Sequence, residues 1–267
     1  MKKTKLITVF LLLFSIIFVS CDTEPLDTNL LENAGDNGGG GTDDGNDGTD
    51  TGGDDTGNGG GTGNGGGIGS AGSYWPMALN NSWTYSQDGV TADPMKLLST
   101  EKADGNTYFR TEHFFTNSGT AGLTGEATVL LRQSEGSYYA RISVEIPATE
   151  GISISVSPYE LILLKDNLDT GKKWTQKIFQ KTSFGMDGIP DVVTQIDVEG
   201  TILEKGITFT ANGKEYKDVI KSQVKQTVTG MVITTTYWYA KNVGPVRIES
   251  KGDGLSSTST LLSYKLN

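Results

Sequence analysis

Apolar and polar residues alternate with a period of two along much of the chain from residue 74 onward. The pattern is clearest in four segments, residues 141–146, 152–157, 192–198 and 219–228. Such alternation is typical of antiparallel strands that bury one face and expose the other. No convincing helical period of any length accompanies it. The pattern therefore predicts an all-β domain.

Short turn signals divide these segments, and most of them pair Asp, Asn or Ser with Gly. Asn212-Gly213, between two strand-like runs, is the clearest two-residue hairpin in the sequence. Regular short strands without intervening helices, about ten to twelve of them, indicate a barrel or a sandwich rather than a parallel sheet. We predict an antiparallel curved sheet or incomplete barrel, with a two-sheet β-sandwich as the alternative.

The first 21 residues have a different pattern, a basic start followed by an uncharged apolar run. Residues 6–19 carry no charge, and fourteen residues are too few to span a membrane, which takes about 20. The run ends at Ser20-Cys21, and Cys21 is the only cysteine. This arrangement resembles the lipobox of bacterial lipoproteins. We predict a signal peptide over residues 1–20 and acylation, for example with palmitate, at Cys21.

The segment after Cys21 indicates where the protein is located. The first residues after the cysteine are acidic or polar and resemble the surface-export signals of Bacteroidota lipoproteins. The lipid anchor makes the membrane a partner. We predict an outer-membrane, lipid-anchored protein, with the surface-facing orientation favoured over the periplasm-facing one.

Residues 21–72 are rich in Gly and Asp, and from Gly35 to Gly72 the only aliphatic side chains are Ile68 and Ala71. Such a segment cannot offset the entropy lost on ordering, so we predict a disordered tether. Residues 22–72 hold eleven acidic and no basic residues, whereas residues 73–267 hold 21 acids and 19 bases. Without a basic excess, the chain is not expected to bind nucleic acid. The globular β-domain is predicted over residues 73–267.

All four tryptophans and all ten tyrosines lie in the predicted β-domain. Trp75, Trp83, Trp174 and Trp238 are each large enough to bury 150–250 Å² as core residues. The alternative is that these rings line a concave sheet and bind an apolar ligand or a sugar. The sequence leaves both interpretations open.

Residues 74–85 resemble the opening "Y-x-P-L-x-x-G-N-x-W-x-Y" of a group of uncharacterised Bacteroidota outer-membrane lipoproteins. Later stretches of the same group resemble residues 163–174, 212–220 and 237–246, so the similarity covers nearly the whole domain. Asn80 stands where Gly is usual. The resemblance implies a curved sheet of the lipoprotein-carrier or lipocalin kind. It implies no activity and no catalytic residues.

Candidate catalytic chemistry is sparse. One histidine, His113, and no cysteine in the predicted domain exclude Cys-His catalysis and multi-histidine zinc sites there, and no cofactor is predicted. Asp187-Gly-Ile-Pro-Asp191 resembles a fragment of thrombospondin-type calcium repeats, although a tight turn also explains it. Two carboxylates acting as in glycoside hydrolases remain an alternative, because their separation is not visible in sequence.

We therefore predict a non-enzymatic, membrane-anchored lipoprotein whose β-domain binds a ligand or an envelope partner, with a lipid or a glycan as the expected ligand. The first alternative is a glycoside hydrolase that uses two carboxylates. The second is a structural subunit of an envelope complex, which would need an apolar docking patch.

Overall fold

The computed structural model describes residues 72–114, 126–149, 152–186, 188–252 and 254–267. Cys21 and the predicted tether lie outside the described residues, apart from Gly72. The described residues belong to one compact unit. They form thirteen strands: β1 (Ser82–Gln87), β2 (Val90–Thr91), β3 (Met95–Ala103), β4 (Asn106–Glu112), β5 (Glu126–Ser134), β6 (Ser137–Thr149), β7 (Ile152–Lys165), β8 (Lys173–Phe184), β9 (Val192–Ala211), β10 (Lys214–Val228), β11 (Met231–Ala240), β12 (Gly244–Gly252) and β13 (Leu255–Lys265).

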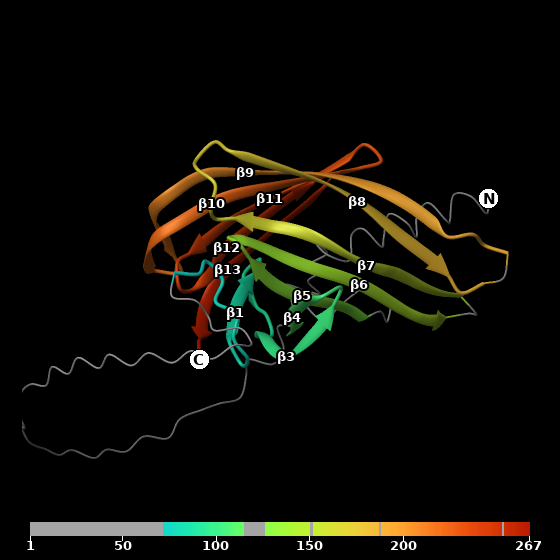
Figure 1. The fold of residues 1–267 in the computed structure, drawn as a ribbon. Coiled ribbons are helices and arrows are strands. Elements are labelled where there is room, and N and C mark those ends of the chain that lie inside the picture. The colour runs from blue at the N-terminus through green and yellow to red at the C-terminus, as the bar shows by residue number, and fades with distance from the viewer. Residues whose placement is uncertain (1–71, 115–125, 150–151, 187, 253) are drawn as a thin grey trace, which may run out of the picture. The chain divides into compact units, whose positions relative to one another are not determined.

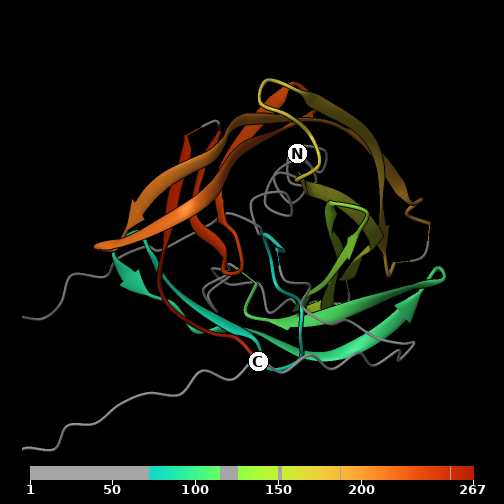
Figure 2. The ribbon, with the colours of Figure 1, turned by 60° about the vertical axis from the view of Figure 1, so that its left-hand side comes forward.

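Twelve of these strands form one closed antiparallel barrel (Figures 1 and 2). From β3 to β13 each strand pairs with the next in sequence. β1 pairs with β3 on one side and with β13 on the other, which closes the ring, while the short β2 pairs only with β1. The prediction of an all-β antiparallel domain is confirmed. The ring is closed, so the barrel is more regular than the predicted incomplete one and is not a sandwich.

Closure depends on β1 and β13, which are about as far apart in the domain's sequence as two strands can be. The register runs from Ser82 opposite Lys265 to Gln87 opposite Ser259, with one irregularity between Thr84 and Tyr85. Because both edges of the sheet are paired, no long row of backbone N–H and C=O groups is left exposed there. The alternation pattern describes each strand separately, so it does not predict that β1 pairs with β13.

The predicted hairpin at Asn212-Gly213 is confirmed between β9 and β10. Both residues have positive φ angles, 48° and 74°, as a type I′ turn requires. β9 and β10 are also the two longest strands. Phe209, near the tip of this hairpin, stacks on Trp238 of β11 at 5.3 Å between ring centroids.

The backbone ladder between β7 and β8 is short for strands of 14 and 12 residues. These strands pair only from Ile154–Phe184 to Val156–Thr182. Beyond that point the side chain of Gln176 bridges them: its Nε2 donates to the Glu160 carbonyl at 2.9 Å, and its Oε1 accepts from the Ile162 N–H at 3.1 Å. The amide side chain thus replaces part of the missing backbone ladder.

Residues 72–81 precede β1 and close one part of the barrel interior. The Tyr74 N–H donates to the Tyr138 hydroxyl of β6 at 2.9 Å. Trp75 is fully buried and contacts Trp83 of β1 edge to face and Tyr239 of β11 at 6.0 Å. Since β1, β6 and β11 lie in different parts of the ring, this segment must cross the interior. Trp75 and Trp83 are therefore core residues.

Candidate ligand site in the barrel interior

One side of the interior wall carries small hydroxyl side chains between apolar ones. The hydrogen-bond register places six buried residues of β9 to β13 and β1 in one row across the strands: Ile202, Ser222, Tyr237, Ile248, Ser259 and Gln87. Directly opposed residues of antiparallel strands point to the same face. Because three of the six belong to the central apolar cluster, the row faces the interior.

A second row lies two residues further along each strand. Its members are Trp174, Gly200, Val224, Thr235, Ser250 and Ser257. Thr235 Oγ1 and Ser250 Oγ lie 3.1 Å apart and hydrogen-bond to each other. We call Ser222, Thr235, Ser250 and Ser259, contributed by β10, β11, β12 and β13, the hydroxyl wall. Neither row contains a charged side chain.

Three buried polar atoms of the barrel interior, on β8, β10 and β11, have no hydrogen-bond partner among the described residues. They are Trp174 Nε1, Ser222 Oγ and Tyr239 OH. The parent residues are almost fully buried, at 6%, 0% and 0% exposed. Leaving such a group unpaired costs about 1–3 kcal/mol, and native structures pair the large majority of them. The arrangement suits a bound molecule that supplies the missing partners.

The protonation state of Tyr239 is set by its surroundings. Burial raises the pKa of Tyr239 well above its ordinary value, and the neighbouring Tyr237, Tyr85 and Tyr138 raise it further. The hydroxyl therefore stays protonated and can donate at neutral pH. An indole N–H is also a donor, while the Ser222 hydroxyl can donate or accept. The site thus offers donors to uncharged oxygen atoms.

The width of the barrel is consistent with an internal ligand. Side chains fill the interior of an eight-stranded barrel or leave room for one small ligand, and the diameter grows with strand number. A ring of twelve strands is wider, and the side chains of the hydroxyl wall are among the smallest. The mouths of β-barrels are a usual place for small-molecule sites.

The structure separates the four tryptophans that the sequence singled out. Trp75 and Trp83 are fully buried, and Trp83 Nε1 donates to the Val243 carbonyl at 2.6 Å. Trp238, 8% exposed, stacks on Phe209 and is flanked by Lys221. Only Trp174 combines an interior position with an unpartnered indole N–H. Its ring lies against Gly200 on the neighbouring strand.

The other predicted chemistry is not assembled in the described residues. They contain no group of three or more His, Cys, Asp or Glu side chains placed to hold a metal. Asp191 forms an ion pair with Lys181 at 2.6 Å, and hydrogen bonds from Lys181 and Ser183 lower its pKa. Asp187 lies outside the described residues, as does Cys21. His113 has a positive φ of 51°, and its Nε2 lies 3.9 Å from a carboxylate oxygen of Glu112.

A separate cluster on the outer face of β4 to β7 is internally satisfied. Arg132 binds both carboxylate oxygens of Glu160, at 2.7 and 2.9 Å, and Tyr108 OH donates to the same carboxylate at 2.6 Å. The Arg132 guanidinium also lies 3.7 Å from the centroid of the Tyr139 ring. Burial alone would raise the pKa of Glu160, but the hydrogen bonds from Arg132 and Tyr108 outweigh it and hold the pKa below its ordinary value. We interpret this cluster as structural.

We expect Glu160→Gln to destabilise the protein by about 2 kcal/mol at pH 7. Because the pKa of Glu160 is lower in the folded than in the unfolded state, its ionised carboxylate stabilises the folded protein at pH values above the unfolded-state pKa. This stabilisation is lost as the pH falls through the folded-state pKa. The difference between wild type and variant should therefore shrink as the pH falls through the lowered folded-state pKa of Glu160. Urea unfolding at pH 7 and pH 3 measures it, with exposed Glu204→Gln as the near-neutral control. An equal loss at both pH values would contradict the assignment.

The comparisons with known proteins do not assign the chain to a family. The fold defines a closed, antiparallel, twelve-stranded barrel. No protein-family model matches the chain, and no curated protein matches it. One similar solved structure is a "putative lipoprotein" from Parabacteroides distasonis, with 12% sequence identity and a TM-score of 0.40, covering 73% of this chain and 99% of that one. Within the described residues no helix is long and apolar enough to cross a membrane.

The sequence signal for the hydroxyl wall is present but was missed. Ser222 and Gln226 share the parity of Val224 and Val228, so a strict period of two places them on the buried face. Polar residues at apolar positions of a strand are a recognisable exception. Thr235 gives no such signal. It lies between Thr234 and Thr236, so no alternation of apolar and polar residues marks it as the buried position.

Proposed function

We propose that the chain is a lipid-anchored binding protein whose barrel holds a neutral, lipid-like molecule without chemically changing it. The observation that carries the proposal is that three buried polar atoms of the barrel interior, Trp174 Nε1, Ser222 Oγ and Tyr239 OH, have no partner among the described residues. The wall offers hydrogen-bond donors beside aliphatic and aromatic side chains. A molecule with an apolar body and a few acceptor oxygens, such as an ester of a fatty acid, matches both features.

A charged head group fits the wall less well than a neutral one. Neither row contains a cation that could pair with a carboxylate or a phosphate, and burying an unpaired charge is costly. The neutral hydroxyl of Tyr239 and the indole N–H of Trp174 would instead donate to carbonyl or ether oxygens. The ligand is therefore an uncharged amphipathic lipid rather than a free fatty acid.

The location belongs to the same proposal. Acylation of Cys21 would anchor the protein in the outer membrane, and residues 22–72 would separate the barrel from the anchor. A barrel held beside a membrane has direct access to lipid. Mass spectrometry of the mature protein from its native membrane should find Cys21 acylated and residues 1–20 removed; an unmodified cysteine or a retained leader would contradict the anchor.

Ligand binding is tested with variants that each remove one of these polar groups: Tyr239→Phe and Ser222→Ala, which keep most of the side-chain shape, and Trp174→Phe, which also shortens the ring system. Exposed Ser263→Ala is the control. Without ligand, the first two should be neutral or stabilising by about 1 kcal/mol, because an unpaired buried group is removed. Fluorescence titration with a fluorescent monoacylglycerol should show saturable binding to wild type, weakened about five- to thirtyfold in each variant. Unchanged affinity, or destabilisation of the ligand-free Tyr239→Phe protein, would refute the site.

A further inference from the structure

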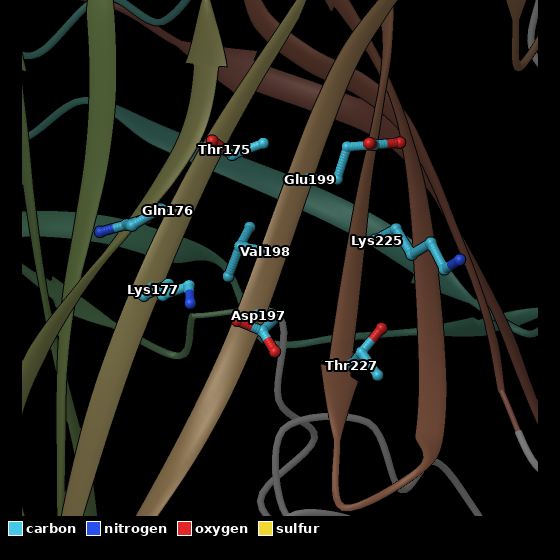
Figure 3. Close-up of a pocket in the computed structure, with 8 residues that line it drawn as sticks. All are labelled: Thr175, Gln176, Lys177, Asp197, Val198, Glu199, Lys225 and Thr227. Atoms are coloured by element: carbon cyan, nitrogen blue, oxygen red, sulfur yellow. The ribbon is translucent and has the colours of Figure 1, made fainter.

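The outer face of β8, β9 and β10 carries a groove of about 500 Å³ with a mixed polar lining (Figure 3). The hydrogen-bond register arranges its side chains in two rows, Thr175–Glu199–Lys225 and Lys177–Asp197–Thr227. These positions alternate with the interior-facing residues of the same strands, so the groove is separate from the hydroxyl wall.

An exposed apolar pair adjoins the groove. Phe179 follows Lys177 on the same face of β8 and is 63% exposed, and Val193 on β9 is 61% exposed. Phe179 lies opposite Gln195, so Val193 is its diagonal neighbour. These are the two most exposed large apolar side chains of the described residues. An aromatic ring and an aliphatic chain at the end of a polar groove give one continuous surface.

The charges in the groove balance. Two lysines and two carboxylates line it. Lys173 Nζ donates to Glu199 at 3.0 Å, and Gln195 Nε2 donates to Asp197 at 2.8 Å. Neither Lys177 nor Lys225 forms an ion pair with a carboxylate of the described residues. An anion would meet both acids, and a cation would meet both lysines, so the lining favours an uncharged ligand.

The lining has the hydrogen-bonding chemistry of a sugar-binding surface. Each sugar hydroxyl both donates and accepts, and the groove supplies acceptors from carboxylates, donors from ammonium groups and threonine hydroxyls that do both. A pyranose ring also has an apolar C–H face that packs on an aromatic ring. From the first row of the groove to Phe179 the surface extends about 14 Å along β8, and its three strands span about 10 Å, enough for a short oligosaccharide.

We propose that the groove and Phe179 together form a binding platform for a neutral oligosaccharide. Phe179 stacks on one sugar ring, while Lys177, Asp197 and Lys225 bind the hydroxyls of the next. This platform works independently of the barrel interior. A protein carrying both sites would hold a lipid inside the barrel and a glycan on its outer face.

The full chain is titrated by calorimetry with the hexasaccharides of cellulose, xylan, mannan and amylose as neutral probes, and with a polygalacturonate oligomer as the charged one. At least one neutral probe should bind with a Kd below about 1 mM, which is a free energy of about −4 kcal/mol. Phe179→Ala and Asp197→Asn should each weaken that binding at least tenfold. Leu98→Ala, which truncates an exposed apolar residue on β3, is the matched control and should change nothing.

Three outcomes would overturn the platform. They are no binding of any neutral probe, equal binding by Phe179→Ala and wild type, or tighter binding of the charged probe. If the wild type instead captures a protein partner that Phe179→Ala does not, the surface is a protein interface. Tyr239→Phe should leave sugar binding intact, so failure of the interior site and failure of this platform are distinguishable.

Discussion

We expect Trp83→Ala to lower the free energy of unfolding by about 3–5 kcal/mol, the usual cost of truncating a buried tryptophan. Trp83 is fully buried, and it connects residues 72–81 to the barrel through its edge-to-face contact with Trp75 at 6.4 Å. Truncation leaves a cavity at this contact. It also removes the donor to the Val243 carbonyl, which the turn after β11 presents to the indole.

Two matched variants separate the causes of this loss. Trp83→Phe keeps most of the ring but removes the hydrogen bond, so it should cost less than Trp83→Ala by about 1–2 kcal/mol or more. Leu98→Ala truncates an exposed side chain and should stay within about 0.5 kcal/mol of wild type. Chemical denaturation followed by circular dichroism measures all three. A cost for Trp83→Ala below about 1 kcal/mol would show that this end of the barrel is not packed as described.

The alternation pattern identifies strands because burial in a strand repeats every two residues. It succeeds along β9 and β10, where Val192 to Val198 and Val219 to Val228 lie in long strands of the wall. It also identifies the turn at Asn212-Gly213, because the required positive φ angles restrict the residues that can occupy it. These features are local, and local sequence is sufficient to predict them.

The closed ring and the interior site could not be derived in the same way. Closure depends on the pairing of β1 with β13, and no local pattern in either strand indicates which strand it pairs with. The hydroxyl wall depends on the register of β10, β11, β12 and β13 with one another. In the sequence, Ser250 and Ser259 resemble ordinary polar residues of a strand. Only the pairing shows that they lie buried on the same inner face of the barrel as Ser222 and Thr235.

For single residues too, the sequence predicts burial but not the hydrogen-bond partners, as the four tryptophans show. Their size predicts burial, and all four are buried. Which of them has a polar atom left to offer a ligand depends on its neighbours: Trp83 finds a carbonyl acceptor, whereas Trp174 does not. The exposed ring proved to be a phenylalanine, Phe179, whose position among Lys and Gln in β8 gives no helical or core signal.

Gly200 is the position where we expect the smallest change of side chain to have a large effect. A Cβ atom at Gly200 would overlap the indole ring of Trp174, which lies directly across on β8. The φ angle of Gly200 is not positive, so its backbone accepts other residues and the conflict is only with the ring. We expect Gly200→Ala to destabilise by about 1–3 kcal/mol, the usual cost of overpacking, and Trp174→Ala by about 3–5 kcal/mol.

The double variant Trp174→Ala/Gly200→Ala shows whether the cost of Gly200→Ala comes from the Trp174 ring or from a general intolerance of substitution at position 200. Once Trp174 is removed, the methyl group of Gly200→Ala occupies vacated space and removes the entropic cost of a glycine in a strand, about 0.5–1 kcal/mol. In the Trp174→Ala background, Gly200→Ala should therefore be neutral or stabilising, which gives a coupling energy of about 1–4 kcal/mol between the two positions. A double-mutant cycle from urea unfolding measures it. Additive effects would mean that Trp174 does not lie over Gly200, and the unpartnered indole N–H would then no longer be placed at the hydroxyl wall.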